Sequence, residues 1–472
     1  MLKRLVVAVA LAFVWAFSTA AAGEPRNDPR PNFLVVVTDD QRPDTIGALG
    51  NPVIQTPTLD RLVREGLAFT CAIAPDPLCV PSRAEILTGR CGFSNGVTSL
   101  GGRFKKELTF WGDAMRGGGY HAWYVGKWMN DGKPITRGYD ETLGLFWSGG
   151  AKWWKDTVDY HGRPVTGYKG WIFQTDDGTK FPELGVGLTK EISKRFADAA
   201  IEFIRRGAKS EKPFFLHVNF TAPHDPLLMP PGYEGRYDPD KMRLPGNFRP
   251  EHPFDHGNLK GRDELLLPFP RTPEDVRADL AVYYAVISHM DEQLGRMLDV
   301  LRETGQAKRT YVIFTSDHGL AVGSHGLRGK QNMYDHTVGV PFLVSGPTVP
   351  AGEVRTTPCY LRDMYPTVCE LAGIAIPDSV NGRSLVPAIR DSEVRVYDEV
   401  FGHFRDVQRM IRTDKWKLIY YPKIGRYQLF DMENDPLEKE DLYGRPCYAT
   451  VIAELRTRLE AWQEEAGDPL VE

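Results

Sequence analysis

The sequence lacks the features of a nucleic-acid-binding or membrane-spanning protein. Its formal charge is only -4 over 472 residues, and no long block of one sign occurs. Neither nucleic acid nor a membrane surface is therefore expected as a main partner. Beyond the N-terminal region no apolar run is long enough to span a bilayer. There is no internal repeat and no low-complexity tract, so the chain predicts a globular protein with a large part and a smaller one.

Cysteine is also scarce for so long a chain. The six cysteines are Cys71, Cys79, Cys91, Cys359, Cys369 and Cys447. Their spacing does not suggest a disulfide framework. If one of them is consumed by chemistry, five remain, and at least one must stay unpaired or pair between chains.

The N-terminus has the pattern of a secretory signal. Lys3 and Arg4 precede an apolar run at residues 5–17, and small residues follow up to Ala22. This order predicts a signal peptide over residues 1–22, cleaved near Ala22. The apolar run is short for a membrane span. We therefore expect an exported protein, periplasmic or secreted.

Apolar runs and helical spacing predict an α/β fold. Strands are expected at residues 32–38, 120–125, 214–220, 310–315 and 340–344, and helices at 57–68, 189–206 and 277–303. This alternation indicates a large mixed, mostly parallel sheet sandwiched by helices. We assign it to a catalytic domain over residues 23–375. Short strands within 408–429 and a helix at 450–464 predict a small C-terminal α+β subdomain with an antiparallel sheet, over residues 376–472.

Two long stretches lack a regular pattern. Residues 131–180 are rich in Gly, Trp, Tyr and Lys, and residues 226–273 are rich in Pro. Long irregular insertions are often functional loops. Aromatic faces stack on sugar rings and basic side chains bind sulfate, so the first stretch favours a sulfated sugar as substrate. The alternative is that these aromatic residues pack the loop onto the core.

Four of the predicted strands each run into polar residues. These are, in chain order, Asp39 and Asp40, then Lys127, then His224, and finally Asp317 and His318. In an open α/β sheet, ligands bind beyond the carboxyl ends of the strands. If the four strands are parallel, these groups meet at one edge of the sheet.

The acidic residues of this group predict a metal site. Asp39, Asp40 and Asp317 cannot all stay ionised at close range without a cation. Oxygen ligands suit a hard divalent ion, calcium ahead of magnesium. His318 either binds the ion or contacts a bound anion. The alternative for the Asp39-Asp40 pair is a turn or a helix cap.

The segment CVPSR, from Cys79 to Arg83, is followed by AEILTGR. It resembles the signature of the type I, formylglycine-dependent sulfatases of the alkaline phosphatase superfamily. The resemblance implies that a formylglycine-generating or sulfatase-maturing enzyme reads Pro81 and Arg83 and oxidises Cys79 before folding. A hydrated formylglycine has one hydroxyl to attack sulfur and another to expel sulfate. It would lie near the metal, so Cys79 is counted among the metal ligands. The alternative is an inert buried cysteine.

Further matches to this family supply cations and a proton donor. The family's G-K, P-H-x-P and second G-K motifs correspond to Lys127, His224 and Lys330. By resemblance, Arg83 and the two lysines neutralise the ester oxygens, and His224 or Lys330 protonates the departing alkoxide. The alternative for each lysine is an ordinary exposed side chain.

The chain departs from the family pattern after the first G-K motif. Many relatives have His where this chain has Met129. The segment with Asn130 resembles N-acetylglucosamine-6-sulfatases and extracellular heparan sulfatases, whereas Asp317-His318 resembles iduronate-2-sulfatase-like members. Without a histidine at position 129, the candidates for the base in sulfate elimination are His318 and His325.

These observations predict hydrolysis of sulfate esters, on a sulfated carbohydrate. One alternative is a phosphodiesterase or phosphonate monoester hydrolase of the same superfamily. The other is an inactive exported glycan-binding protein, which only Met129 supports.

Overall fold

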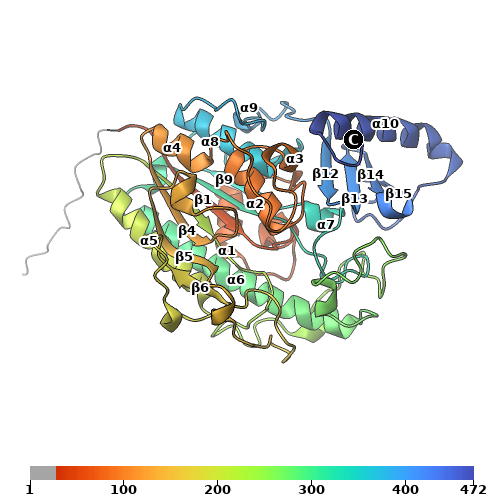
Figure 1. Ribbon diagram of the computed structural model, residues 1–472, viewed down its shortest axis with the longest axis horizontal. Helices are drawn as coiled ribbons and strands as arrows, with labels where there is room; N and C mark the ends of the chain where they lie inside the picture. The colour runs from red at the N-terminus through yellow and green to blue at the C-terminus, as the bar shows by residue number, and fades with distance from the viewer. Residues whose placement is uncertain (1–27, 472) are drawn as a thin grey trace, which may run out of the picture.

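The computed structural model describes residues 28–471, so the predicted signal peptide lies outside the described residues. Its centre is a nine-stranded sheet in the order β10-β2-β9-β8-β1-β7-β4-β5-β6 (Figure 1). The strands are β1 (Asn32–Thr38), β2 (Leu67–Phe69), β4 (His121–Lys127), β5 (Glu141–Ser148), β6 (Trp171–Gln174), β7 (Phe214–Asn219), β8 (Thr310–Ser316), β9 (Phe342–Ser345) and β10 (Glu353–Arg355). A separate pair joins β3 (Ala72–Ile73) to β11 (Cys359–Tyr360).

The middle of this sheet is parallel. β1 pairs in parallel with both β7 and β8, and β4 pairs in parallel with β7 and β5. Only β6 and β9 run antiparallel to their neighbours. All seven residues of β1 are buried, as expected for a strand that helices cover on both faces. The predicted mixed, mostly parallel sheet is confirmed.

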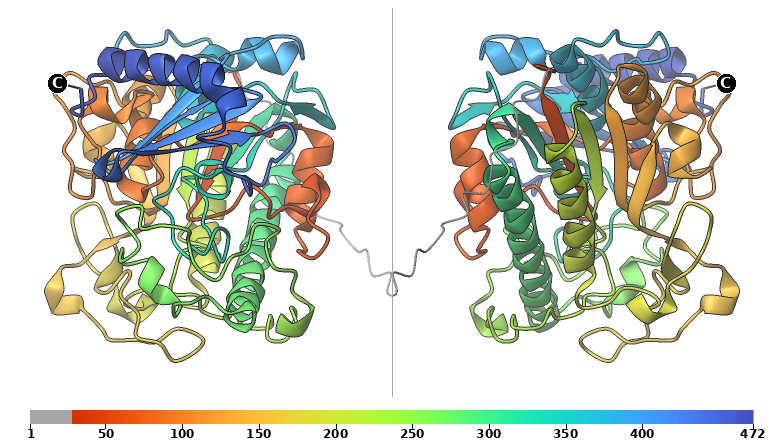
Figure 2. Two further views of the ribbon diagram at one scale, coloured as in Figure 1. Left: turned by 90° about the vertical axis from the view of Figure 1, so that its right-hand side faces the viewer. Right: turned by 90° about the vertical axis from the view of Figure 1, so that its left-hand side faces the viewer.

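Alternate residues of β1 point into two separate cores. Leu34 and Val36 pack with α1, α5 and α6 on one face, whereas Phe33, Val35 and Val37 pack with α2, α4 and α8 on the other. The helices are α1 (Pro57–Glu65), α2 (Cys79–Thr88), α3 (Gly92–Asn95), α4 (Trp111–Gly117), α5 (Ile192–Ala208), α6 (Pro273–Glu303), α7 (Asp335–Val338), α8 (Met364–Ala372), α9 (Val386–Arg390) and α10 (Ala449–Ala466). Figure 2 shows α5 and α6 side by side over the sheet. Among residues 28–471, no helix has the length and apolar character needed to cross a bilayer.

The C-terminal part forms a second, antiparallel sheet at one end of the molecule (Figure 1). Its strands are β12 (Val400–Phe404), β13 (Gln408–Arg412), β14 (Trp416–Tyr421) and β15 (Arg426–Asp431). Ile411, Leu418 and Leu429 pack against Leu455 and Leu459 of α10. The predicted C-terminal antiparallel sheet and helix are confirmed, while the division of the chain at residues 375 and 376 stays a prediction.

Seven of the described strands fall where the sequence pattern did not indicate them: β2, β3, β5, β6, β10, β11 and β12. Helix α1 ends at Glu65, so the end of the helix predicted over residues 57–68 belongs instead to β2. β5 and β6 lie within the stretch predicted to be irregular, and β12 precedes the first predicted C-terminal strand. β5 does not alternate, because Gly144 has a positive φ of 59° and the pairing with β4 shifts register after Val125. In β12, Gly402 and the buried His403 interrupt the apolar run. Neither β5 nor β12 therefore has the period of two that marks a half-buried strand.

Three buried histidines and a tyrosine join the C-terminal sheet to the rest of the protein. The ring of His325 stacks on Tyr334 with 3.8 Å between centroids, and His252 Nε2 lies 3.0 Å from the Tyr334 hydroxyl. His256 Nδ1 lies 3.2 Å from Nε2 of Gln408 on β13. Burial lowers the pKa of His252 to about 3 and those of His256 and His325 to about 4. These imidazoles therefore stay neutral in the folded protein.

We expect this histidine network to make the fold sensitive to acid. The lowered pKa values mean that its stabilising effect is present above about pH 6.5 and is lost as the pH falls toward about 4, because the unfolded chain binds the protons first. The change His256→Gln should reduce the slope of unfolding free energy against pH by up to about 1.4 kcal/mol per pH unit. Urea denaturation at several pH values measures this slope. The exposed His161→Gln should keep the wild-type slope, and an unchanged slope in His256→Gln would contradict the prediction.

Candidate active site

The parallel strands bring their polar C-terminal residues to the same edge of the sheet. Asp39 follows β1 directly, Lys127 is the last residue of β4, and Asp317 follows β8 directly. His224 lies five residues beyond β7. All four side chains are buried. The structure thus gathers groups that lie far apart in the sequence.

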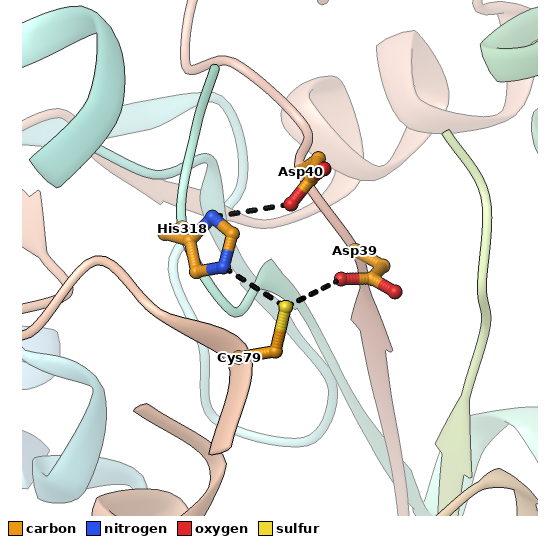
Figure 3. A group of neighbouring side chains, drawn as sticks. All are labelled: Asp39, Asp40, Cys79 and His318. Carbon is orange, nitrogen blue, oxygen red and sulfur yellow. Dashed lines mark hydrogen bonds and ion pairs between the residues drawn. The ribbon is translucent and has the colours of Figure 1, made fainter. Parts of the chain in front are cut away.

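Helix α2 delivers Cys79 to this edge. Cys79 is the first residue of α2, and all ten residues of the helix are buried, so packing on every side fixes its direction. Cys79 Sγ lies 3.4 Å from Asp39 Oδ1 and 3.4 Å from His318 Nε2 (Figure 3). Lys330 Nζ lies 3.2 Å from the same sulfur. Burial raises the pKa of the Cys79 thiol, with Lys127 and Lys330 only partly offsetting it. An unmodified Cys79 is therefore a protonated thiol.

Asp39 is held ionised by the cations around it. Its Oδ2 forms an ion pair with Lys127 and accepts a hydrogen bond of 2.5 Å from the Tyr168 hydroxyl. Burial by itself would raise the pKa of Asp39. Lys127, His224 and Arg83 more than offset this effect and hold the pKa well below its usual range.

Asp40 has one carboxylate oxygen engaged and one open. Its φ of 69° lies in the left-handed region, which Asp tolerates better than most residues. Oδ1 accepts from Lys330 Nζ at 2.8 Å and lies 3.3 Å from His318 Nδ1. Oδ2 is buried and has no hydrogen-bond partner in the described part of the chain. His224 Nε2 lies 3.7 Å from this oxygen.

Arg83 connects the ends of three neighbouring strands. Its Nε donates to Asp317 Oδ2 at 3.0 Å, and another nitrogen donates to the Thr38 carbonyl at 3.1 Å. The third nitrogen donates to the side chain of Asn219, the last residue of β7. Asp317 Oδ1 accepts from the backbone amides of Asp40 and His318. The guanidinium thus contacts β1, β7 and β8 at the same time.

His224 is oriented by its neighbour in the chain. Its Nδ1 lies 2.6 Å from the carbonyl oxygen of Asp225, which leaves Nε2 facing Asp40. The Asp225 carboxylate forms an ion pair with Arg262. The ring of Tyr168 meets His224 edge-on, with 4.8 Å between centroids.

The two histidines considered as a base lie in different places. His318 contacts Cys79, whereas Nε2 of His325 lies 2.9 Å from the carbonyl of Glu438, in the histidine network. Met129 packs beside Val80 in a small apolar cluster. Asn130 donates to the Val80 carbonyl at 2.9 Å and so holds the first turn of α2.

Sequence reasoning missed two residues of the site. The role of Tyr168 at Asp39 rests on a single hydroxyl within an irregular stretch, where no spacing marks it. Glu264 accepts from the backbone amides of Arg328 and Gly329 and from the Arg271 side chain, and so fixes the loop that carries Lys330. Glu264 lies in the Pro-rich stretch, and its pairing with residues 64 positions away leaves no local signal.

The family of the chain follows from comparison with known proteins. The sulfatase family profile matches residues 31–374, and the profile of the N-sulphoglucosamine sulphohydrolase C-terminal region matches residues 323–465. An arylsulfatase of Clostridium perfringens is 30% identical over 458 residues, covering 90% of this chain and 93% of the relative. The chain belongs to the sulfatase family. It is an enzyme that hydrolyses sulfate esters, as the resemblance of the CVPSR segment implies.

Two more comparisons concern relatives that act on sulfated sugars. An N-acetylglucosamine-6-O-sulfatase of Bacteroides thetaiotaomicron is 26% identical to this sulfatase, over 96% of this chain and 90% of the relative. A solved structure in complex with its substrate, D-glucosamine-2-N,6-O-disulfate, superposes with a TM-score of 0.75 at 24% identity. It covers 93% of this chain and 99% of that one, and it shows the shared fold.

We expect Tyr168→Phe to slow the sulfatase without unfolding it. The change removes the donor to Asp39, and hydrogen bonds to charged groups are worth about 1.5–3 kcal/mol. If that stabilisation is needed in the transition state, kcat/KM should fall by about 10-fold to 100-fold. Steady-state kinetics on a sulfate ester, with a melting curve alongside, measure both effects. The control is Tyr237→Phe, because the Tyr237 hydroxyl bonds Ser288 and the Gln55 amide instead of Asp39, and this variant should keep wild-type kinetics. Wild-type kinetics in Tyr168→Phe would contradict the role of Tyr168.

Proposed function

We propose that this sulfatase removes sulfate from a sulfated glycan, using a formylglycine made from Cys79 and a divalent cation, calcium ahead of magnesium. The proposal rests on one observation: Cys79 belongs to one buried cluster of contacting side chains that holds three carboxylates and three cationic groups. This arrangement joins the CVPSR segment to the groups that an anionic ester requires.

Position 79 carries the nucleophile in this proposal. The Sγ atom of Cys79 stands where the oxygen of formylglycine would lie. When oxidised and hydrated, the side chain offers two hydroxyls, one to attack sulfur and one to lose its proton as sulfate departs. The thiol itself is a poor substitute, because its raised pKa keeps it protonated.

The residues around Cys79 fit a divalent cation. One ligand atom each from Asp39, Asp40, Cys79 and His318 lies within 4.8 Å of the others. The open Oδ2 of Asp40 is a buried carboxylate oxygen that lacks a partner among residues 28–471. We propose that Asp39, Asp40, Asp317 and the side chain at position 79 hold the ion, because oxygen ligands suit calcium. His318 Nδ1 faces the Gly319 carbonyl and Asp40, so only its Nε2 has a lone pair to offer, and we assign that nitrogen to proton transfer rather than to the ion. When bound, the ion supplies positive charge that favours deprotonation of a nearby hydroxyl and offsets charge on the sulfate.

The remaining side chains handle charge and protons. Lys127 pairs with Asp39, and Lys330 pairs with Asp40 and contacts Cys79. Together with Arg83 these lysines would offset the negative ester oxygens. His224 is a candidate to protonate the departing alkoxide, because Asp225 holds its Nδ1 and leaves Nε2 facing the pocket. Lys330 is the other candidate, since it contacts Cys79 directly.

His318 is the better placed of the two histidines for sulfate elimination. Its Nε2 lies 3.4 Å from Cys79 Sγ, so it can accept the proton of the second hydroxyl at position 79. His325 is engaged with Glu438 and Tyr334 instead. We therefore propose His318 for this role.

A cavity lined in part by Asp225 is suited to the sugar. Its volume is about 240 Å³, and its lining includes Arg163, Arg328, Asp225 and Asp279. Guanidinium groups can bind sulfate and hydroxyl oxygens, and carboxylates can accept hydrogen bonds from hydroxyls. The N-acetylglucosamine-6-O-sulfatase relative agrees with a glycan substrate. We propose that a sulfated sugar enters through this cavity.

A sulfate-release screen tests the substrate and the nucleophile together. We expect the mature enzyme, produced with a maturing enzyme, to release sulfate from at least one defined sulfated oligosaccharide faster than from an aryl sulfate. Mass spectrometry of the peptide around position 79 should show an aldehyde in place of the thiol. Cys79→Ala should abolish release, and the exposed Cys447→Ala should not.

Each rival reading has its own outcome in this screen. If a phosphate diester or phosphonate monoester is turned over faster than every sulfate ester, the preferred substrate is a phosphorus ester. Cleavage of the aryl sulfate alone would reject the glycan. An active enzyme with an intact Cys79 thiol would reject formylglycine, and an unmodified, inactive protein from the native host would favour a glycan-binding protein.

Removal of the cation should stop the reaction. We expect a chelator to abolish activity and calcium to restore it at lower concentration than magnesium. Asp40→Asn keeps the left-handed backbone accessible but removes one charge, so it should raise the calcium requirement by about 10-fold or more. Activity is titrated against free calcium, with the exposed Asp299→Asn as the matched control. Full activity in the chelated enzyme would contradict the metal site.

A further inference from the structure

A second cluster of metal-binding side chains lies apart from the contacts of Cys79. One ligand atom each from Glu85, Cys91 and His403 lies within 4.8 Å of the others. Glu85 is on α2, Cys91 immediately precedes α3, and His403 is on β12 of the C-terminal sheet. The proposed sulfatase chemistry uses none of these three residues.

The imidazole ring of His403 is buried, and its two nitrogens are unsatisfied in the described part of the chain. The ring stacks on Phe93 with 4.2 Å between centroids, which fixes its plane. A Cβ on Gly92 would lie 3.6 Å from Nε2, so this nitrogen faces the backbone beside Cys91. Nδ1 faces the other way, 3.7 Å from Asp76 Oδ2.

Asp76 is likewise buried and unsatisfied. It is fully buried, and both carboxylate oxygens lack a hydrogen-bond partner in the described residues. Buried polar atoms are nearly always paired, so orphaned atoms on two adjacent side chains point to a missing ligand or proton. A ligating histidine commonly donates its second ring N–H to a carboxylate. Asp76 stands on the correct side of His403 for that role.

The charges around the cluster leave room for one dication. Glu85 accepts from Arg362 at 2.9 Å and from the Gly92 amide at 2.9 Å, and each oxygen keeps a further lone pair. Asp76, Glu85 and a Cys91 thiolate would carry three negative charges. Arg362 pairs with Glu85, while the other nearby arginines are Arg409, which pairs with Asp468, and the exposed Arg405. One divalent ion would balance the remainder.

We propose that Glu85, Cys91 and His403 bind a zinc-class ion, with Asp76 orienting His403. Thiolate, imidazole and carboxylate are the donors that zinc prefers, and three protein ligands leave a fourth position for water. The ion would fasten α2 to the C-terminal sheet. The proposal is independent of formylglycine and of the calcium site.

The competing arrangement contains no metal. Burial and the neighbouring Glu85 raise the pKa of Asp76 well above its usual range, so the carboxyl group can instead be protonated. Burial, again with Glu85, raises the pKa of Cys91 to about 11, so the thiol can remain protonated too. A spectroscopic probe that requires a metal-bound thiolate separates the two arrangements.

Cobalt titration of the full-length protein is this probe. The chelated protein is titrated with CoCl₂ in the presence of excess CaCl₂, which occupies the calcium site. We expect one equivalent of Co²⁺ to produce a near-ultraviolet thiolate-to-cobalt band, which ZnCl₂ then displaces. The band should persist in Cys79→Ser and in the exposed-cysteine control Cys447→Ser, and it should disappear in Cys91→Ser.

Two further variants test the arrangement of the ligands. His403→Gln should abolish the band or weaken Co²⁺ binding strongly. Asp76→Asn should weaken binding by about 10-fold to 100-fold while keeping the band, because it acts through the histidine. Absence of the band in Cys79→Ser, or its survival in Cys91→Ser, would overturn the proposal. If Cys91→Ser fails to fold, the proposal is tested by the Co²⁺ titrations of Cys79→Ser and His403→Gln. Equal Co²⁺ affinity in those two proteins would overturn the proposal.

Discussion

The burial of three carboxylates at one edge of the sheet is the constraint on which the site depends. Asp39, Asp40 and Asp317 are fully buried, and ionised groups there are tolerable only beside opposite charge. Arg83 and Lys127 meet this need for Asp317 and Asp39. Lys330 meets it for Asp40. The cations that suit an anionic substrate are therefore also the groups that allow the acids to be buried.

The same groups set the geometry of the strands. Because Arg83 contacts β1, β7 and β8, the position of the strand ends depends on a side chain from α2. Cys79 lies one helical turn away on the same helix, so its position relative to Asp39 follows from the Arg83 contacts. The buried network thus serves both the fold and the pocket.

Much of the fold was predictable because its central strands have strong local patterns. β1, β7 and β8 are continuous apolar runs, and the polar residues at their ends stand out against them. Strand β5 was not predictable, because Gly144 and a register shift disturb its pattern. Tertiary pairing rather than local preference determines such a strand.

The same distinction applies to the site. Arg83, Lys127 and Lys330 belong to short motifs that the sequence displays, whereas Tyr168 and Glu264 act through contacts that only the folded chain creates. His325 is a candidate base in the sequence, where it is close to His318. It does not contact Cys79, because its Nε2 faces the Glu438 carbonyl instead. Side-chain chemistry could be predicted from motifs, but long-range partners could not.

The complete burial of α2 has a consequence for timing. Cys79 and Arg83 are each only 3% exposed, so another enzyme cannot bind this segment once the chain has folded. Modification of position 79 by another enzyme must therefore take place before the chain folds. A molecule that folds first keeps its thiol until this segment unfolds again.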